Sequence, residues 1–334
     1  MPASGRGHLE LVCPAGTPAG LRAAVDAGAH AVYCGFRDET NARNFPGLNF
    51  DRAEMADGIA YAHRHGAKVL IALNTFMRAG ATGLWKRAVD DAVALGADAL
   101  ILADIALVAH AREAHPRQRL HLSVQAAAAT PEAVALYRDR FGIARVVLPR
   151  VLTVEEIGRL TAAAAPCETE VFVFGGMCVM AEGRCLLSSY ATGKSPNMTG
   201  VCSPPSHVAY RQDKDALVVS LGGLTIERLA PDEPAGYPTL CKGCFQANGA
   251  ASHLFEEPVS LNAVNLLPRL VAAGVTAFKI EGRQRSRAYV AAVVKVFRRA
   301  LDALAAGRPV DTGTLRALTE GQHDTAGAYR KTWR

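Results

Sequence analysis

The feature that most constrains the fold is a pattern that returns along the chain, a glycine followed closely by a short aliphatic run. It occurs at "AGAHAVYCG", "LGADALILAD", "FGIARVVLPR" and "AGVTAFKIEG". A glycine just past a helix end, followed by a buried β-branched run, is typical of the helix-to-strand half of a β/α unit. Counting such runs predicts eight strands. They cover residues 9–14, 31–36, 68–74, 99–104, 120–125, 144–150, 170–175 and 277–283.

Amphipathic segments separate these strands, and two of them open with recognisable helix starts. Thr130 precedes Pro131, and Thr153 precedes Glu155 and Glu156. Strands that alternate with helices pair in parallel through right-handed crossovers. Eight such units favour a closed (β/α)8 barrel of the TIM type. A doubly wound open sheet is the alternative, but no GxGxxG motif follows the first strand. We therefore expect a single barrel domain over residues 1–334.

The seventh strand-to-helix connection departs from this pattern. The next helix is expected only at residues 260–274, whereas such connections usually take about two to six residues. Residues 176–257 are therefore predicted to form an insertion, with a hairpin in residues 207–229. Long loops on this face of a barrel commonly carry function.

The composition is that of a chain with a large core. Half of the residues are apolar, 20% are charged, and the net charge is +6. The first residues lack the apolar core of a signal peptide, and no run approaches the roughly 18 apolar residues that span a membrane. We expect a cytoplasmic protein without stable membrane insertion. The positive charge is mild and dispersed, and aromatic residues are few, which favours small anionic substrates and argues against nucleic acid.

Polar residues end several of the predicted strands. In a barrel these ends meet at the C-terminal face, where active sites are built. The residues are Asn74, Asp104, Gln125, Arg150, Glu281 and Arg283. Each one alone is equally compatible with a salt bridge or a helix cap, but the set predicts a polar pocket that accepts an anion.

The chain has eight cysteines. In a reducing compartment, metal binding or redox chemistry is a better expectation for them than disulfides. Cys13, Cys34 and Cys167 lie in or beside apolar segments and are expected to be small buried hydrophobes. The other five lie in the insertion: Cys178, Cys185, Cys202, Cys241 and Cys244. Their wide spacing favours an iron–sulfur cluster over zinc, because only "CKGC" resembles a zinc knuckle; unligated thiols are the third alternative.

The segment "EVFVFGGMCVMAEGRCLLSS" resembles the signature of the collagenase-like peptidase family. Further stretches resemble its ubiquinone-biosynthesis branch, UbiU, from residue 9 to 334. They include "LVCPAG", "DETNARNFPGLNF", "LSVQA", "GYPTLCKG" and "KIEGRQRSRAYV". The resemblance implies a subunit of a hydroxylase that acts on ubiquinone precursors without molecular oxygen. It also implies a [4Fe-4S] cluster, a UbiV-like paralogue as heterodimer partner, and prephenate as oxygen donor. A lipid-carrier protein would deliver the polyprenyl substrate.

The resemblance places the cluster ligands at Cys178, Cys185, Cys202 and Cys241. Two positions depart from the family pattern: Gly176 stands where Ser or Ala is usual, and Cys244 adds a fifth thiol. Arginines are suited to clamp a dicarboxylate, since a guanidinium matches a carboxylate bidentately. The candidates at the mouth of the barrel are Arg43, Arg150, Arg184 and Arg283.

Three other functions remain as alternatives. Some relatives in the family hydroxylate tRNA or ribosomal RNA, but those proteins are longer. A cluster-bearing scaffold without activity is the second. Peptidase activity is the third and the least favoured, because the sequence contains neither H-E-x-x-H nor G-x-S-x-G.

Overall fold

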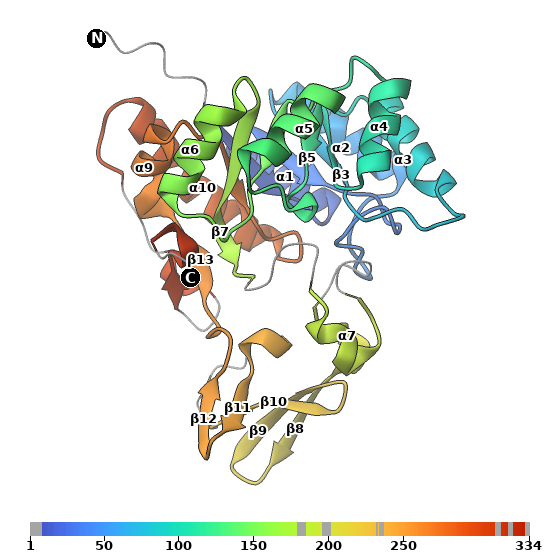
Figure 1. Ribbon diagram of the computed structural model, residues 1–334. Coiled ribbons are helices and arrows are strands. Elements are labelled where there is room, and N and C mark those ends of the chain that lie inside the picture. The colour runs from blue at the N-terminus through green and yellow to red at the C-terminus, as the bar shows by residue number, and fades with distance from the viewer. Residues whose placement is uncertain are drawn as a thin grey trace.

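Eight parallel strands close into a barrel, as the sequence predicts (Figure 1). The structure is a computed structural model that describes residues 9–178, 185–195, 202–231, 233, 237–310, 315–319 and 323–330. Neighbouring strands pair in chain order from β1 to β7, and β14 closes the barrel by pairing with both β1 and β7. The barrel strands are β1 (Glu10–Pro14), β2 (Ala31–Cys34), β3 (Lys68–Leu73), β4 (Ala99–Leu102), β5 (Leu120–Leu122), β6 (Arg145–Val147), β7 (Glu168–Gly176) and β14 (Ala277–Ile280).

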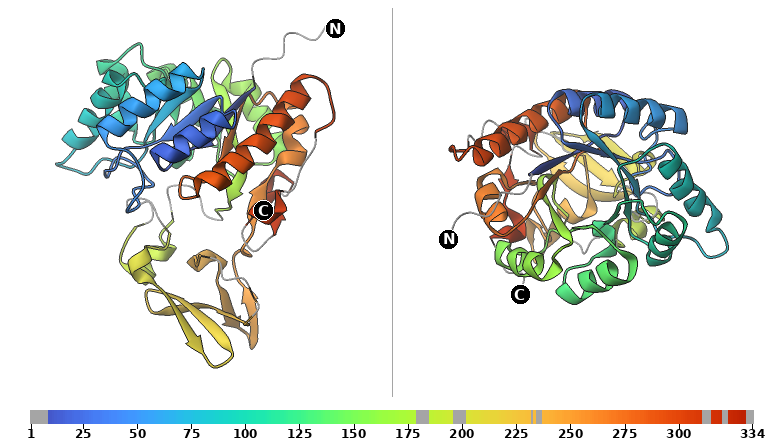
Figure 2. Two further views of the ribbon diagram at one scale, coloured as in Figure 1. Left: turned by 180° about the vertical axis from the view of Figure 1, so that it is seen from behind. Right: turned by 90° about the horizontal axis from the view of Figure 1, so that it is seen from above.

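Helices form a ring around the barrel (Figure 2). Thr130 and Thr153 cap α5 and α6 through their side-chain oxygens, which confirms both predicted helix starts. The Thr153 cap is a complete capping box with Glu156. The helices are α1 (Pro18–Asp26), α2 (Arg52–Arg64), α3 (Gly83–Ala94), α4 (Ile105–Ala114), α5 (Pro131–Phe141), α6 (Val154–Ala164), α9 (Leu267–Ala272) and α10 (Arg287–Ala305).

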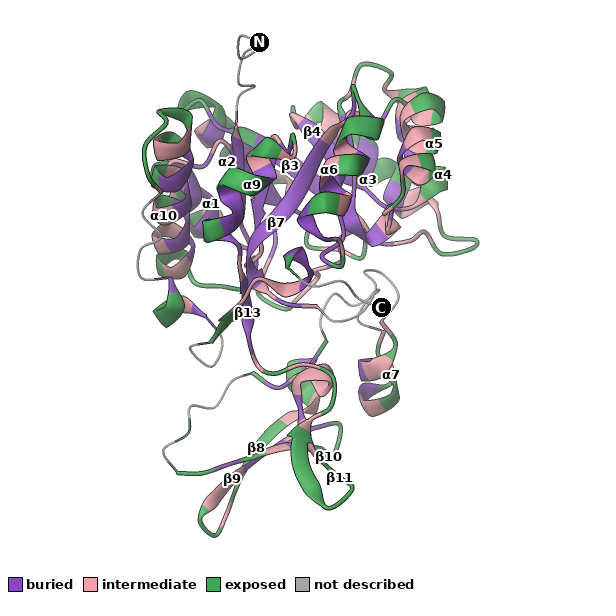
Figure 3. Cartoon of the chain, turned by 60° about the vertical axis from the view of Figure 1, so that its left-hand side comes forward, coloured by how far each residue is buried: buried purple, intermediate pink, exposed green. Residues whose placement is uncertain are grey.

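The region between β7 and β14 contains a small β-rich unit beyond the C-terminal face of the barrel (Figures 1 and 3). The predicted hairpin is a three-stranded antiparallel sheet of β8 (Val208–Asp213), β9 (Ala216–Leu221) and β10 (Leu224–Leu229). Beside it lie α7 (Leu187–Thr192) and the two-stranded sheet of β11 (Cys244–Ala247) and β12 (Ala250–His253). Its strands are mostly exposed or half-buried, whereas the barrel strands are buried.

The expected helix over residues 260–274 was wrong at its start. Residues Ser260–Asn262 form β13, which runs antiparallel to β7 and also pairs with β15 (Asp324–Thr325). Ser260 and Leu261 are buried and Asn262 is half-buried, and the three residues pair with β7 as a strand before α9 begins. No described helix has both the length and the apolar character required to cross a membrane.

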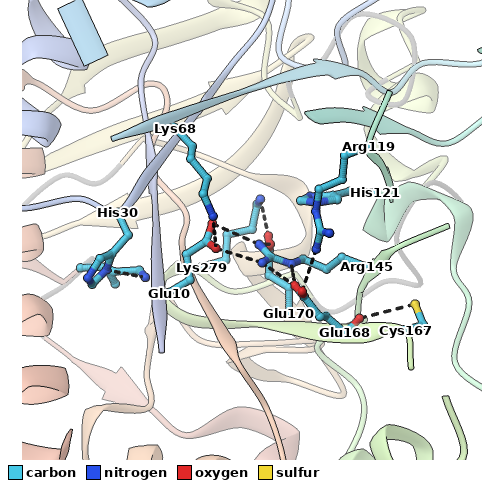
Figure 4. Close-up of polar contacts among 11 residues, drawn as sticks. Glu10, His30, Lys68, Arg119, His121, Arg145, Cys167, Glu168, Glu170 and Lys279 are labelled. Carbon is cyan, nitrogen blue, oxygen red and sulfur yellow. Dashed lines mark hydrogen bonds and ion pairs between the residues drawn. The ribbon is translucent and has the colours of Figure 1, made fainter. Parts of the chain in front are cut away.

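The barrel interior is divided between an apolar layer and a network of charges. The apolar part includes Val12, Leu70 and Ile101. At the centre of the charged part lies Arg145, whose side chain is 4% exposed. Its guanidinium contacts three carboxylates, those of Glu10 at 3.1 Å, Glu168 at 2.6 Å and Glu170 at 3.1 Å (Figure 4).

A lysine lies at each end of this network (Figure 4). Lys68 contacts Glu10 at 3.2 Å and keeps a side chain that is 56% exposed. Lys279 contacts Glu170 at 2.6 Å and is almost fully buried. The network therefore extends from solvent beside the start of β3 to the interior end of Lys279.

Replacing the central cation tests the energetic importance of the network. Arg145→Ala leaves three carboxylates without their shared partner, so we expect it to lower the free energy of unfolding by ~3–5 kcal/mol. Arg269→Ala is the matched control, because Arg269 pairs with Glu155 at the surface and exposed pairs contribute about 0–1 kcal/mol. Urea denaturation measures both. Similar losses in the two variants would contradict the assignment.

The same network predicts how stability depends on acid. Burial raises the pKa of Glu10 and of Glu168, but Arg145 outweighs burial and holds both pKa values below 4.5. A carboxylate with a lowered folded-state pKa stabilises the fold above the unfolded value, and that contribution is lost as pH falls through the folded value. Below pH 4.5, the wild-type chain should therefore lose stability more steeply than Arg145→Ala.

Candidate functional site

A pocket opens at the C-terminal ends of the barrel strands, on the face that carries the insertion. Six of the seven residues predicted to bind substrate line it. They are Arg43, Asn74, Gln125, Arg150, Glu281 and Arg283. Arg184 lies outside the described residues. The structure therefore brings the six together, while their role as substrate ligands stays a prediction.

Asp104 was predicted to join this set and does not line the pocket. Its carboxylate caps α4, accepting hydrogen bonds from the backbone amides of Ala106 and Leu107. A second oxygen accepts from the amide of Met77 at 3.0 Å. The residue is a helix cap, the alternative that its sequence position left open.

Three further pocket residues were missed as candidates: Tyr33, Phe172 and Lys279. Lys279 precedes Glu281 and Arg283 by two and four positions. Strand alternation predicts that all three share one face, although Lys279 was not among the predicted substrate ligands. The Lys279 ammonium lies 3.8 Å from the Tyr33 ring centroid. The Arg150 guanidinium lies 4.5 Å from the Phe172 ring centroid. The pocket therefore combines aromatic walls with cations.

Arg283 is a buried cation that donates a hydrogen bond to a neutral group. Its side chain is 4% exposed and donates to the Asn41 amide oxygen at 2.7 Å. Burial lowers the pKa of the guanidinium to about 10. Four cationic residues and one carboxylate line the pocket. Lys279 is already paired with Glu170, so the positive charge that suits an anionic ligand comes mainly from the three arginines.

Asn74 and Glu281 organise the pocket rim. Asn74 accepts a hydrogen bond from the Ala42 amide at 3.0 Å, and this fixes the loop that carries Arg43. Burial raises the pKa of Glu281, but the charges of Arg43 and Arg150 outweigh burial and hold that pKa below its usual value. Glu281 is therefore a carboxylate near neutral pH.

The end of β7 is held by two pocket side chains. The Gly176 amide donates to Oε2 of Glu281 at 3.1 Å, and the Gly176 carbonyl accepts from Arg150 at 2.5 Å. Gly176 lies two residues before Cys178. The pocket and the first cysteine of the insertion thus share a structural support.

The four predicted cluster ligands are linked through Cys202, whose pKa responds to each of the other three. Partial burial raises the pKa of the Cys202 thiol to about 11, and Cys178, Cys241 and Cys185 raise it further, whereas Arg43 lowers it. Burial also raises the pKa of Cys241, with a contribution from Cys185. Cys202 keeps an exposed surface and the others are half-buried. Arg43 thus lines the pocket and also lowers the pKa of Cys202. We define the cysteine group as Cys178, Cys185, Cys202 and Cys241.

Among the residues that the structure describes, no three His, Cys, Asp or Glu side chains converge on a single ion position. Thiolates around a cubane bind different irons and need not converge in that way. Cys244 starts β11, where it pairs with His253. Cys13, Cys34 and Cys167 are buried, as expected.

Comparison with known proteins identifies the family. The family model described as peptidase family U32 matches residues 16–329. The chain belongs to this family. It is 33% identical over 326 residues to tRNA hydroxylation protein P of Escherichia coli K12, covering 92% of this chain and 71% of the relative. It is 30% identical over 301 residues to the 23S rRNA 5-hydroxycytidine C2501 synthase of the same organism, covering 89% and 40%.

A solved U32 structure, the U32 peptidase Mk0906, matches 52% of this chain and 71% of its own, with 19% identity and a TM-score of 0.41. Relatives of this U32 chain are thus named for hydroxylation of RNA, and the family name itself refers to peptidases.

Proposed function

We propose that this U32 chain is a cluster-bearing subunit of an oxygen-independent hydroxylase. The observation that carries the proposal is the position of a cationic pocket beside the four-cysteine group. Relatives named for RNA hydroxylation support the reaction class. The two sites adjoin through Arg43 and Gly176, so that a substrate in the pocket would lie near the cysteines.

Cys178, Cys185, Cys202 and Cys241 would hold a [4Fe-4S] cluster. Four thiolates match the valences of a cubane, and Cys178, Cys185 and Cys241 each contribute to the raised pKa of Cys202. When bound, such a cluster supplies electron transfer or Lewis-acid polarisation. Zinc remains the alternative for a four-thiolate site.

The pocket residues would bind and orient an oxygen donor with carboxylate groups, for which prephenate is our proposal. Arg283 and Arg150 would supply guanidinium donors, and Lys279 would supply a buried ammonium below them. Tyr33 and Phe172 would exclude water and offer flat surfaces to a ring. Arg43 would hold the entrance next to the cysteine group.

A ubiquinone precursor is one proposed substrate. Its support is the resemblance of many separate segments, from "LVCPAG" to "KIEGRQRSRAYV", to the UbiU branch. This proposal includes a UbiV-like paralogue as partner, a lipid-carrier protein for the polyprenyl chain, and a cytoplasmic location. The insertion exposes Tyr190, Tyr237 and Phe255, which would suit contact with a partner protein.

An RNA base is the second proposed substrate, and the comparisons support it more directly. The named relatives are a tRNA hydroxylation protein and a 23S rRNA hydroxycytidine synthase. Each base is a flat ring, as a quinone precursor is, so the aromatic pocket walls fit both substrates.

Growth of a strain without this gene, in the absence of oxygen, tests the function and the substrate together. Quinones and their precursors, and hydroxylated nucleosides of tRNA and 23S rRNA, are measured by mass spectrometry. Accumulation of unhydroxylated quinone precursors, reversed by the wild-type gene, is expected for the quinone substrate. Loss of hydroxylated nucleosides would instead identify RNA. If both pools match the parent strain, the hydroxylase proposal is wrong.

A further inference from the structure

The Gly176 peptide is held on both sides by pocket residues of opposite charge. We propose that Arg150 and Glu281 are positioning residues that transmit occupancy of the pocket to Cys178. The proposal rests on the proposed function, because the position of Cys178 matters most if this thiolate binds the cluster.

The backbone at this point cannot move independently of Glu281. Gly175 has a φ of +118°, and a Cβ there would lie 2.6 Å from the Glu281 carbonyl oxygen. The Glu281 amide in turn donates to the Phe174 carbonyl at 2.8 Å. Such close approach of two backbones requires glycine. The end of β7 therefore follows any displacement of the segment after β14.

Arg150 connects the same peptide to the pocket. Its guanidinium donates to the Gly176 carbonyl, packs on the Phe172 ring and lines the pocket, with 6% of the residue exposed. A carboxylate that enters the pocket competes for this guanidinium, because a carboxylate is a stronger acceptor than a peptide carbonyl. Binding of an anion should therefore weaken the bond to Gly176.

Cys178 is the first thiol after this support. With Gly176 released, the two-residue connection to Cys178 gains freedom, and the thiol becomes more accessible. In the loaded protein the same displacement alters the environment of the cluster. Pocket occupancy and the cluster are thereby coupled through one peptide group.

The test uses the full chain without iron, with malonate as the anionic probe. Alkylation of each thiol by iodoacetamide is followed by peptide mass spectrometry, and half-buried Cys244 serves as the internal control. Malonate should speed alkylation of wild-type Cys178 by about tenfold, the factor expected from loss of one charge-assisted hydrogen bond. The rate at Cys244 should not change.

Substitutions distinguish coupling between the pocket and Cys178 from a purely structural role of Arg150 and Glu281. Arg150→Lys should raise the Cys178 rate without malonate and abolish the response, because lysine lacks the planar fork. Glu281→Ala should also raise the alkylation rate of Cys178 without malonate. Glu281→Gln keeps an acceptor for the Gly176 amide, so its rate should be close to that of the wild type. Circular dichroism checks that each variant is folded. A wild-type Cys178 rate that malonate leaves unchanged overturns the coupling.

The iron-loaded chain supplies a second measurement. Malonate should change the visible spectrum of wild-type protein and leave that of Arg150→Lys unchanged. If the chain binds no iron but Cys178 still responds to malonate, the cluster proposal is wrong and the coupling between the pocket and Cys178 is supported. Full iron content with an insensitive Cys178 would contradict the coupling alone.

Discussion

Cys241→Ser is expected to purify without colour, whereas Cys244→Ser keeps the full cluster. Prepared without oxygen, the wild-type chain should contain about four irons and four sulfides, as a cubane requires. The substitution at Cys241 should remove most of this iron and all hydroxylation. Cys244→Ser should leave the iron content and the hydroxylation activity equal to those of the wild type within experimental error.

The reason is the position of the two thiols. Burial and the neighbouring Cys185 raise the pKa of Cys241, and both thiols contribute to the raised pKa of Cys202. Cys244 is the first residue of β11 and pairs there with His253. The two cysteines are separated by two residues, so they cannot easily bind the same iron without strain. The thiol in the cysteine group is the better ligand.

Iron and sulfide analysis beside circular dichroism decides between the two thiols. Cys178→Ser and Cys185→Ser should also lose iron while the barrel stays folded, because these ligands lie outside the eight barrel strands. A colourless Cys244→Ser would show that the fourth ligand was wrongly assigned. Stoichiometric zinc without sulfide in the wild-type chain would contradict the cluster itself.

Much of the barrel could be predicted from local sequence. Most of the barrel strands are short aliphatic runs that closely follow a glycine. Helix starts such as Thr130 and Thr153 have side-chain caps that depend on nearby residues alone. Five of the six pocket residues followed from one rule, the convergence of strand ends at a single face, and Arg43 was predicted separately as an arginine suited to a carboxylate. Asp104 also ends a strand, but its carboxylate caps the following helix α4 and does not line the pocket.

The remaining features depend on contacts between distant residues. Ser260–Asn262 becomes β13 because β7 and β15 pair with it, and no local pattern distinguishes it from a helix start. The ion network joins Glu10, Arg145 and Glu170 from three strands. The Gly176 support depends on side chains 26 and 105 positions away. Composition and spacing contain no signal for such pairs.

Arg283→Met should stabilise the chain and impair its pocket. Burial lowers the pKa of Arg283 to about 10, so the fold bears a cost for this cation throughout the neutral range. Replacing it with an apolar side chain of similar length should raise the free energy of unfolding at pH 7 by ~1–3 kcal/mol. Asn41 keeps a partner, because its side-chain oxygen also accepts from the Arg43 amide at 3.0 Å.

The same substitution should weaken malonate binding by about 10- to 100-fold, the range for loss of a charge-assisted hydrogen bond. Urea denaturation and calorimetry give the two quantities. Arg285→Met is the matched control, since Arg285 is exposed nearby and should leave both almost unchanged. Iron content should remain normal in Arg283→Met, because Arg283 donates to Asn41 and not to the Gly176 peptide. A variant that lost stability and anion affinity together would mark Arg283 as a structural residue. Gain of stability together with loss of malonate affinity would identify Arg283 as a cation that serves ligand binding at a cost to the fold.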